Sequence, residues 1–345
     1  MFGPGVPGAA TAASTTRGPA RPAVILGGPP GGVRDPAVRP PDARPTPAPT
    51  STRRPFQGAP LPFTLSHAAA VLPAVRRDGG GRGRLVSSVL VAGSFAPDMT
   101  YYAASAVPGG MRFGSVTHSF AGVVSVDVLI AWALAGLWLL VREPLVALAP
   151  RARQDRPAAL LRCGAPRARV RADSLAWWYV SAVLGALTHV VWDAFTHHDR
   201  WGSRLVPGLG RVVAGLPRYT WLQYGSSAVA AVVIAVFLVR ALRRAPAGEP
   251  AGVPALSVRD RWWATAVVGG CALAGAVQRA ARWWAYPGAS VRPLDLVPTL
   301  CFGVGAGLLL GVLLYAAGVR LWRPVRVPDG PGGVAGAGRD RSAAR

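Results

Sequence analysis

Six apolar stretches restrict most strongly how this chain can fold. They are residues 85–107, 119–141, 175–195, 222–239, 262–278 and 296–318. A helix of about 20 apolar residues crosses the hydrocarbon core of a bilayer, and it satisfies its backbone hydrogen bonds within one segment. A seventh stretch, 61–75, is too short to span comfortably. We therefore predict an all-α fold, a polytopic membrane helix bundle with about six spanning helices and a short N-terminal helix.

The amount and placement of charged residues also indicate a membrane protein. The formal net charge is +23, yet only 15% of the residues are charged, whereas a soluble chain carries about 25%. All 38 basic residues are arginine, and they lie between the apolar stretches instead of forming a stripe with interleaved aromatic residues. This placement is typical of the positive-inside rule, so we expect no nucleic-acid partner.

The loops between the apolar stretches differ in arginine content, and this difference predicts an orientation. The arginine-rich segments are 142–174, 240–261 and 319–345, and the arginine-poor ones are 108–118, 196–221 and 279–295. Cytoplasmic loops carry the excess of basic residues. We therefore expect a multi-pass protein of the cell (plasma) membrane whose C-terminus is cytoplasmic.

The two ends of the chain differ in composition from its centre. Within residues 1–60, 23 positions are proline or glycine, which predicts a disordered Pro/Gly/Arg-rich leader. This leader is either a flexible tail or a segment upstream of the true translation start near Leu61. Residues 61–320 are expected to form the membrane helical domain, and 321–345 a disordered cytoplasmic tail. The three cysteines lack the spacing of a disulfide framework or a cysteine zinc site.

Histidine is scarce, and its placement predicts a site. The five histidines lie in or beside apolar stretches: His67, His118, His189, His197 and His198. His189, Asp193 and His197 are spaced four residues apart, so they form one polar stripe on an apolar helix, whereas His198 points elsewhere. Imidazole nitrogen and carboxylate oxygen suit zinc or a similar divalent ion. We predict His189 and Asp193 as metal ligands and His197 as a catalytic group. The alternative is a hydrogen bond that packs two helices.

Other polar positions are expected at the same membrane depth. Asp98 ends a run of small residues, and His118 lies between two hydroxyl residues at the start of the next apolar stretch. We predict His118 as a metal ligand and Asp98 as a catalytic carboxylate, unless the backbone satisfies each of them. His67 joins the metal ligands if the short first helix enters from the outer side. Asp127 is expected to have a structural or relay role, and Gln223 either bonds to the site or anchors its helix at the interface.

These motifs together resemble a known family. The segments are 62–68 (PFTLSHA), 93–98 (GSFAPD), 117–119 (THS), 185–189 (GALTH) with Asp193, 195–197 (FTH) and 223–226 (QYGS). They are similar to the bacterial membrane family called domain of unknown function 4184, over about residues 62–240. In that family the first motif lies close to the initiator methionine, which implies a late start or an added leader here. The chain more distantly resembles inner-membrane metal-dependent hydrolases, which implies hydrolase activity.

Two functions remain open from the sequence. The first is a metal-dependent hydrolase with a His/Asp site near the outer membrane face, where a divalent metal such as zinc activates water. Its substrate, reached from the outer leaflet, is expected to be a membrane lipid or another amphiphile. The second is a non-enzymatic transporter or scaffold with a structural metal or a proton-relay site, which the intramembrane Asp127 favours.

Overall fold

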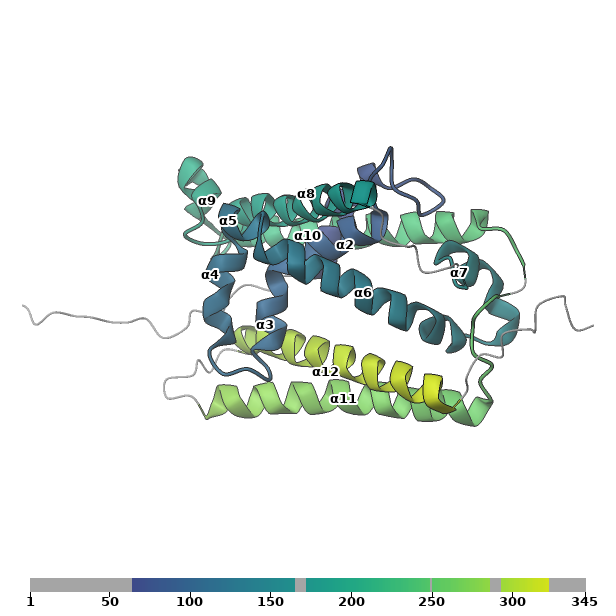
Figure 1. Cartoon of the computed structure of the whole chain (residues 1–345). Helices are drawn as coiled ribbons and strands as arrows, with labels where there is room; N and C mark the ends of the chain where they lie inside the picture. The colour runs from purple at the N-terminus through teal and green to yellow at the C-terminus, as the bar shows by residue number, and fades with distance from the viewer. Residues whose placement is uncertain (1–63, 165–171, 249, 286–292, 323–345) are drawn as a thin grey trace, which may run out of the picture. The chain divides into compact units, whose positions relative to one another are not determined.

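Five long helices dominate the part of the chain that the structure, a computed structural model, describes: residues 64–164, 172–248, 250–285 and 293–322 (Figure 1). These helices are α6 (Val126–Ala147), α8 (Ala172–Thr196), α10 (Arg218–Arg244), α11 (Val258–Trp284) and α12 (Pro293–Trp322). By length and composition, each of these five could cross a membrane. The predicted all-α polytopic bundle is confirmed, and this composition is that of a multi-pass membrane protein. The predicted leader lies outside the described residues, as does the predicted C-terminal tail from residue 323 onward, whereas residues 321–322 belong to α12.

Short elements connect the long helices. The first group is η1 (Thr64–His67), α1 (Ala68–Val71), η2 (Leu72–Ala74), α2 (Ser87–Phe95), η3 (Ala96–Asp98), α3 (Met99–Ala103), η4 (Gly110–Phe113), α4 (Gly114–Thr117) and α5 (Phe120–Val123). The second group is η5 (Arg151–Arg153), α7 (Asp155–Leu160), α9 (Trp201–Leu205), η6 (Pro207–Gly210), β1 (Val212–Val213) and β2 (Leu216–Pro217). The two strands pair antiparallel, with Ala214 and Gly215 at positive φ in the turn.

The stretch 85–107, expected to span as one helix with a kink at Pro97, is instead broken into α2, η3 and α3. Pro97 lies at the start of η3, where its missing N–H cannot continue the hydrogen bonding of α2. The break therefore follows from the proline that the sequence places in the middle of this stretch. Its consequence is that Asp98 lies in the protein interior, fully buried, instead of at the end of a straight helix.

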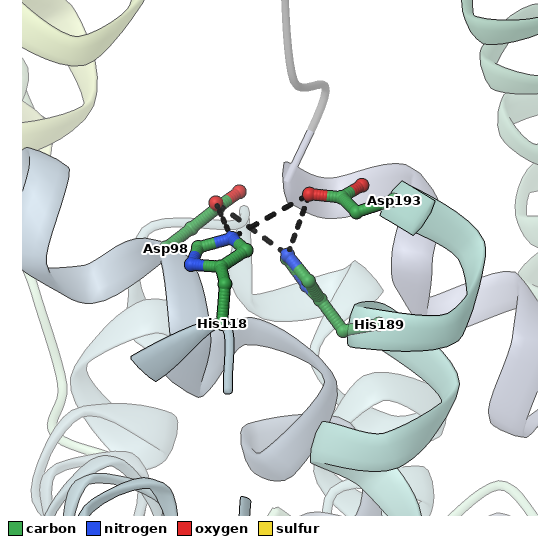
Figure 2. A group of neighbouring side chains, drawn as sticks. All are labelled: Asp98, His118, His189 and Asp193. Carbon is green, nitrogen blue, oxygen red and sulfur yellow. Dashed lines mark ion pairs between the residues drawn. The ribbon is translucent and has the colours of Figure 1, made fainter. Parts of the chain in front are cut away.

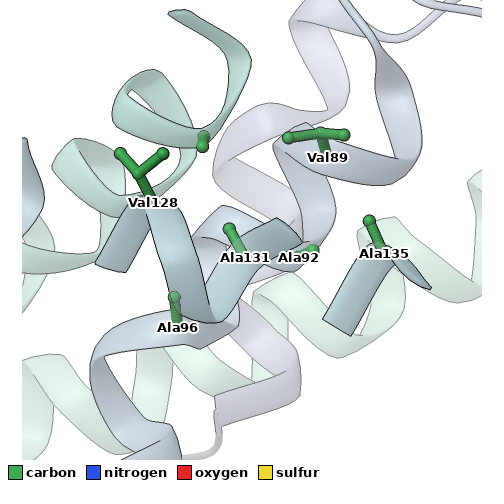
Figure 3. Close-up of a cluster of buried hydrophobic side chains, with 7 residues drawn as sticks. Val89, Ala92, Ala96, Val128, Ala131 and Ala135 are labelled. Atoms are coloured by element: carbon green, nitrogen blue, oxygen red, sulfur yellow. The ribbon is translucent and has the colours of Figure 1, made fainter. Parts of the chain in front are cut away.

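Small side chains let α2, α6 and α8 pack closely. Their shared core consists of seven residues, drawn in Figure 3: Val89, Ala92, Ala96, Val128, Ala131, Ala135 and Ala182. Five of the seven are alanine. In a membrane, lipid tails are as apolar as leucine, so helices associate mainly through close van der Waals packing of such small residues. This core holds the broken segment against α8.

The closest approach of α2 to α8 occurs at two glycines. A Cβ added at Gly93 would overlap the backbone of Ala182, and one added at Gly185 would overlap the carbonyl oxygen of Leu90. One turn after Gly185, His189 reaches across to α2, and its Nδ1 lies 2.7 Å from the carbonyl oxygen of Ser94. The glycines thus determine how close His189 comes to the broken segment.

A separate glycine seam joins α11 to α12, which lie side by side in Figure 1. Gly303, Gly307 and Gly311 on α12 face α11, and a Cβ at Gly303 or Gly307 would overlap the carbonyl oxygen of Gly275 or Cys271. This four-residue repeat of small residues is a common way for two membrane helices to approach. Both helices contact the rest of the bundle: α12 packs against α3 and α6, and Arg279 of α11 donates to the carbonyl oxygen of Tyr101.

We expect Gly185→Ala to destabilise the contact between α2 and α8. The new methyl group would overlap a backbone carbonyl, so a helix must move, and overpacking of this kind costs about 1–3 kcal/mol. Thermal unfolding in detergent should show a lower midpoint. The control is Gly136→Ala on α6, where an added Cβ meets nothing within 4 Å. Equal losses of stability in the two variants would contradict this account.

Candidate metal site

Three segments bring two aspartates and two histidines together (Figure 2). Asp98 ends η3, His118 follows α4 directly, and His189 and Asp193 lie one turn apart on α8. All four side chains are buried. The sequence predicted each of them as a site residue, and the structure places them in one group.

The spacing of this group is that of metal ligands. The Nε2 atom of His118 lies 3.5 Å from Asp98 Oδ1 and 3.5 Å from Asp193 Oδ2. The Nε2 atom of His189 lies 3.5 Å and 3.4 Å from the same two oxygens. Metal–ligand bonds of about 2.1 Å in a tetrahedron put neighbouring ligand atoms roughly 3.4 Å apart. One ligand atom from each residue lies within 4.8 Å of the others, so the group could hold a metal ion.

Backbone carbonyls orient both imidazoles. His118 Nδ1 lies 2.9 Å from the carbonyl oxygen of Gly114, and His189 Nδ1 lies 2.7 Å from that of Ser94. A carbonyl only accepts, so each Nδ1 carries the hydrogen and each Nε2 presents a lone pair to the group. This arrangement, with the second ring nitrogen donating to a carbonyl, is the usual support of a metal-binding histidine.

Several buried polar atoms of the group lack a hydrogen-bond partner among the described residues. They are His189 Nε2, Asp98 Oδ1 and Asp193 Oδ1. Leaving a buried donor or acceptor unsatisfied is costly, and such atoms in a native fold call for an ion or a water. Two carboxylates and two imidazoles are donors that a divalent ion accepts, so the residues present fit a metal.

The other oxygen of Asp193 faces two further histidines. His67 Nε2 lies 3.4 Å from Asp193 Oδ1, and His197 Nδ1 lies 3.5 Å from the same atom. The His67 ring also stacks on His189, with centroids 3.7 Å apart. The short first helix therefore brings His67 to the site, as the sequence prediction required, but on the far oxygen of Asp193.

Burial and neighbouring groups shift the pKa values of His67 and Asp98, two site residues that lie outside the long helices. Burial lowers the pKa of His67 to about 3, so this imidazole is neutral. Burial alone would raise the pKa of Asp98, but the neighbouring His189 and His118 hold it below its usual range. The Thr64 hydroxyl donates to Asp98 Oδ2, and Tyr102 donates to the Thr64 hydroxyl (3.0 Å). Asp98 is thus an ionised carboxylate held by a short hydrogen-bond chain.

A partly open cavity of about 200 Å³ adjoins the group. It is lined by His118, Val190, Asp193, Asp199, Arg200 and Trp201. A water needs only about 15 Å³ by the same measure, so the cavity has room for a polyatomic ligand. Because His118 and Asp193 line it, a ligand in this cavity would lie beside the metal group.

Other predicted positions fall at different distances from the group. His197 is partly exposed, at 15% of its side chain, and its Nε2 lies 3.1 Å from the Gln223 amide nitrogen, so Gln223 bonds to the site region. His198 is exposed and pairs with Asp199, outside the group; its spacing predicted only that it would point elsewhere. Asp127 is fully buried, and neither of its carboxylate oxygens has a hydrogen-bond partner among the described residues.

Sequence reasoning missed Thr64 and Arg200. Thr64 lies in the motif that also contains His67, three residues earlier, so its proximity to a histidine was a usable signal. Arg200 follows the His197–Asp199 run directly, but it is one of 38 arginines, and most of those occupy loops for topological reasons.

The fold and the group define a class: a multi-pass helical membrane protein with a buried Asp/His group that could hold a metal ion. The family model described as a domain of unknown function (DUF4184) matches residues 61–317, and the chain belongs to that family. Neither the comparison with curated proteins nor that with solved structures gives a match. The resemblance to the domain of unknown function 4184 is therefore confirmed, and the match extends beyond residue 240 through most of α12.

We expect the protein purified in detergent to contain about one divalent metal ion per chain, measured by elemental analysis. His189→Ala and Asp193→Ala should lose this metal, because each removes one ligand and leaves a buried counter-charge. His198→Ala is the control, since this exposed histidine lies outside the group. Metal that is sub-stoichiometric in the wild type, and unchanged in both ligand variants, would overturn the site.

Proposed function

We propose that this protein is a membrane-embedded metal-dependent hydrolase. The observation that carries the proposal is the buried set of Asp98, His118, His189 and Asp193, whose Nε2 and carboxylate atoms have ligand spacing and adjoin a cavity. A divalent ion bound there, zinc in our proposal, would lower the pKa of a bound water and polarise the bond to be cleaved. Backbone carbonyls orient both imidazoles, and the Thr64 hydroxyl donates to Asp98.

The residues of the chain take distinct roles in this proposal. Asp98, His118, His189 and Asp193 hold the ion, with Asp98 a ligand in place of the catalytic carboxylate that the sequence predicted. His67 packs on His189 and orients Asp193 from its other oxygen. His197 accepts and releases the proton, because it is the partly exposed histidine beside Asp193 and can exchange protons with water.

The position of the group in the bundle supports a site near one membrane face. Trp262 and Trp263 at the start of α11 and Trp284 at its end are exposed, at 71%, 62% and 69%. Trp263 and Trp284 are separated by about 32 Å along a helix, close to the ~30 Å of a bilayer core, as expected of two interfacial belts. Near the second belt, Arg279 donates to the carbonyl oxygen of Tyr101, whose ring packs on His118.

Exposed apolar side chains on α10 support a lipid environment. Val229, Val232 and Leu238 are exposed along this helix, which a bilayer would cover. We infer that the protein lies in the cell membrane with its C-terminus in the cytoplasm, and that the substrate is a lipid or other amphiphile entering at the outer leaflet. The arginine distribution of the loops supports this orientation.

The hydrolase proposal predicts metal-dependent turnover. Purified wild-type protein, screened with phospholipid and phosphoester substrates, should lose activity in chelator and regain it when zinc is returned. Asp193→Asn should lower the rate by at least about 100-fold, because it removes a charged ligand, whereas His198→Ala should retain the rate. Turnover that survives both the chelator and Asp193→Asn would contradict the proposal.

The orientation can be tested by reporter fusions. Fusions after residue 160, between α7 and α8, should give a cytoplasmic signal, and fusions after residue 210, between α9 and α10, an external signal. The physical reason is that the first loop carries more arginines and is retained inside. A cytoplasmic signal from the second fusion would overturn the outward-facing site.

A second candidate function is a transporter or scaffold with a structural ion or a proton relay. Asp127 favours it, because a fully buried carboxyl group without a hydrogen-bond partner in a membrane helix is costly unless it has a use. Asp127→Asn separates the two functions. The hydrolase proposal expects this variant to keep its metal and its turnover, whereas a relay through Asp127 would lose its proton movement.

A further inference from the structure

Arg200 is the basic residue that lines the cavity beside the metal group. It lies in the turn between α8 and α9, where Asp199 takes a left-handed conformation with φ of 57°. This turn directs α9 back onto α8: a Cβ at Gly202 would meet the backbone of Ala194, and the Trp201 ring packs edge-on against Phe195 at 5.5 Å. The chain around Arg200 is therefore held firmly over the end of α8 that carries Asp193.

The Arg200 guanidinium has polar neighbours but no carboxylate partner. It lies near Tyr101, whose ring packs on His118 at 5.5 Å. Asp199, the next residue in the lining, pairs with His198 instead, at 3.1 Å. Among ion pairs between described residues, none includes Arg200. Its charge is therefore available to a ligand in the cavity.

A count of charges indicates the sign of that ligand. Asp98 and Asp193 together offset a divalent cation, and neutral imidazoles add nothing to the balance. Asp199 in the lining also carries a negative charge, but its side chain is 75% exposed and faces His198, so water screens it. Arg200, which is less exposed, contributes a positive charge to a half-enclosed space, where an anion is attracted more strongly than in bulk water. A neutral amide, glycoside or simple ester would leave this guanidinium without a partner. The planar fork of arginine matches the oxygens of a phosphate group.

We propose that Arg200 binds the phosphoryl group of an anionic substrate, so that the reaction of this site is phosphate-ester hydrolysis; this inference rests on the hydrolase function proposed above. In the reaction, the water oxygen forms a bond to phosphorus and the bond from phosphorus to the ester oxygen breaks. The departing alcohol takes one proton of the water, and the phosphate product keeps the other. The phosphoryl group can belong to a lipid headgroup or to a soluble ester, and both offer the same oxygens to Arg200.

The test is calorimetric titration of inorganic phosphate into the full-length, metal-loaded protein in detergent. We expect Arg200→Ala to weaken phosphate binding by about tenfold or more, and Arg200→Lys to weaken it less, because lysine keeps the charge without the fork. Metal content, measured on the same samples, should stay at the wild-type level, which also shows that the variants are folded. The matched control is Arg204→Ala, one helical turn further along, whose exposed side chain donates to the Asp199 carbonyl oxygen.

Further arms of the experiment identify the source and the class of the anion. Tighter binding of short-chain phosphatidic acid than of inorganic phosphate would assign the phosphoryl group to a lipid, and the reverse order to a soluble ester. Acetate is the comparison anion. Acetate that binds as tightly as phosphate, with the same dependence on Arg200, would overturn the phosphate-ester assignment.

The failure of this inference differs from the failure of the proposed function. If the wild-type protein holds metal and Arg200→Ala binds phosphate as tightly as the wild type does, the role of Arg200 is overturned and the metal site is left intact. A wild-type protein that holds no metal overturns the proposed function and this inference together.

Discussion

Two carboxylates buried in an apolar helix bundle are the constraint on which the rest of this structure depends. Asp98 and Asp193 lie almost completely out of solvent, and each faces the same pair of imidazole nitrogens. Burying a charge is expensive unless partners compensate it. The surrounding hydroxyls, carbonyls and histidines are arranged so that Asp98 Oδ1, Asp193 Oδ2 and the two Nε2 atoms lie close to one another. With this spacing the group could hold a metal ion, in addition to any role in helix packing.

Close backbone approach makes this arrangement possible. His189 can bond to the Ser94 carbonyl only because Gly93 and Gly185 let α2 and α8 meet without side chains between them. The alanine-rich core with α6 then holds the broken segment in register. The position of His189 therefore depends on two glycines that do not belong to the site. A bulkier side chain at either position would push α2 and α8 apart and move His189.

The sequence predicted much of the fold and of the site. Apolar length alone identified α6, α8, α10, α11 and α12, because membrane thickness sets a minimum helix length. The spacing of His189, Asp193 and His197 indicated one helix face. The structure confirms this, because both histidines lie beside the Asp193 carboxylate. Pro97 indicated a kink, but its size was not predictable, because it depends on how α3 packs against α12. The same limit explains why Thr64 and Arg200 were missed: their roles come from contacts between segments far apart in the sequence.

The glycine seam between α11 and α12 has a consequence for the order in which the protein is made. Every member of the metal group lies between Asp98 and Asp193, so the ligand set is complete before α11 is synthesised. The last two long helices pair mainly with each other and reach the earlier part through contacts such as Gly305 against Tyr102 and Arg279 to the Tyr101 carbonyl. During biosynthesis, the four residues of the group are therefore made first, and the α11–α12 pair that packs against this part of the chain is made afterwards.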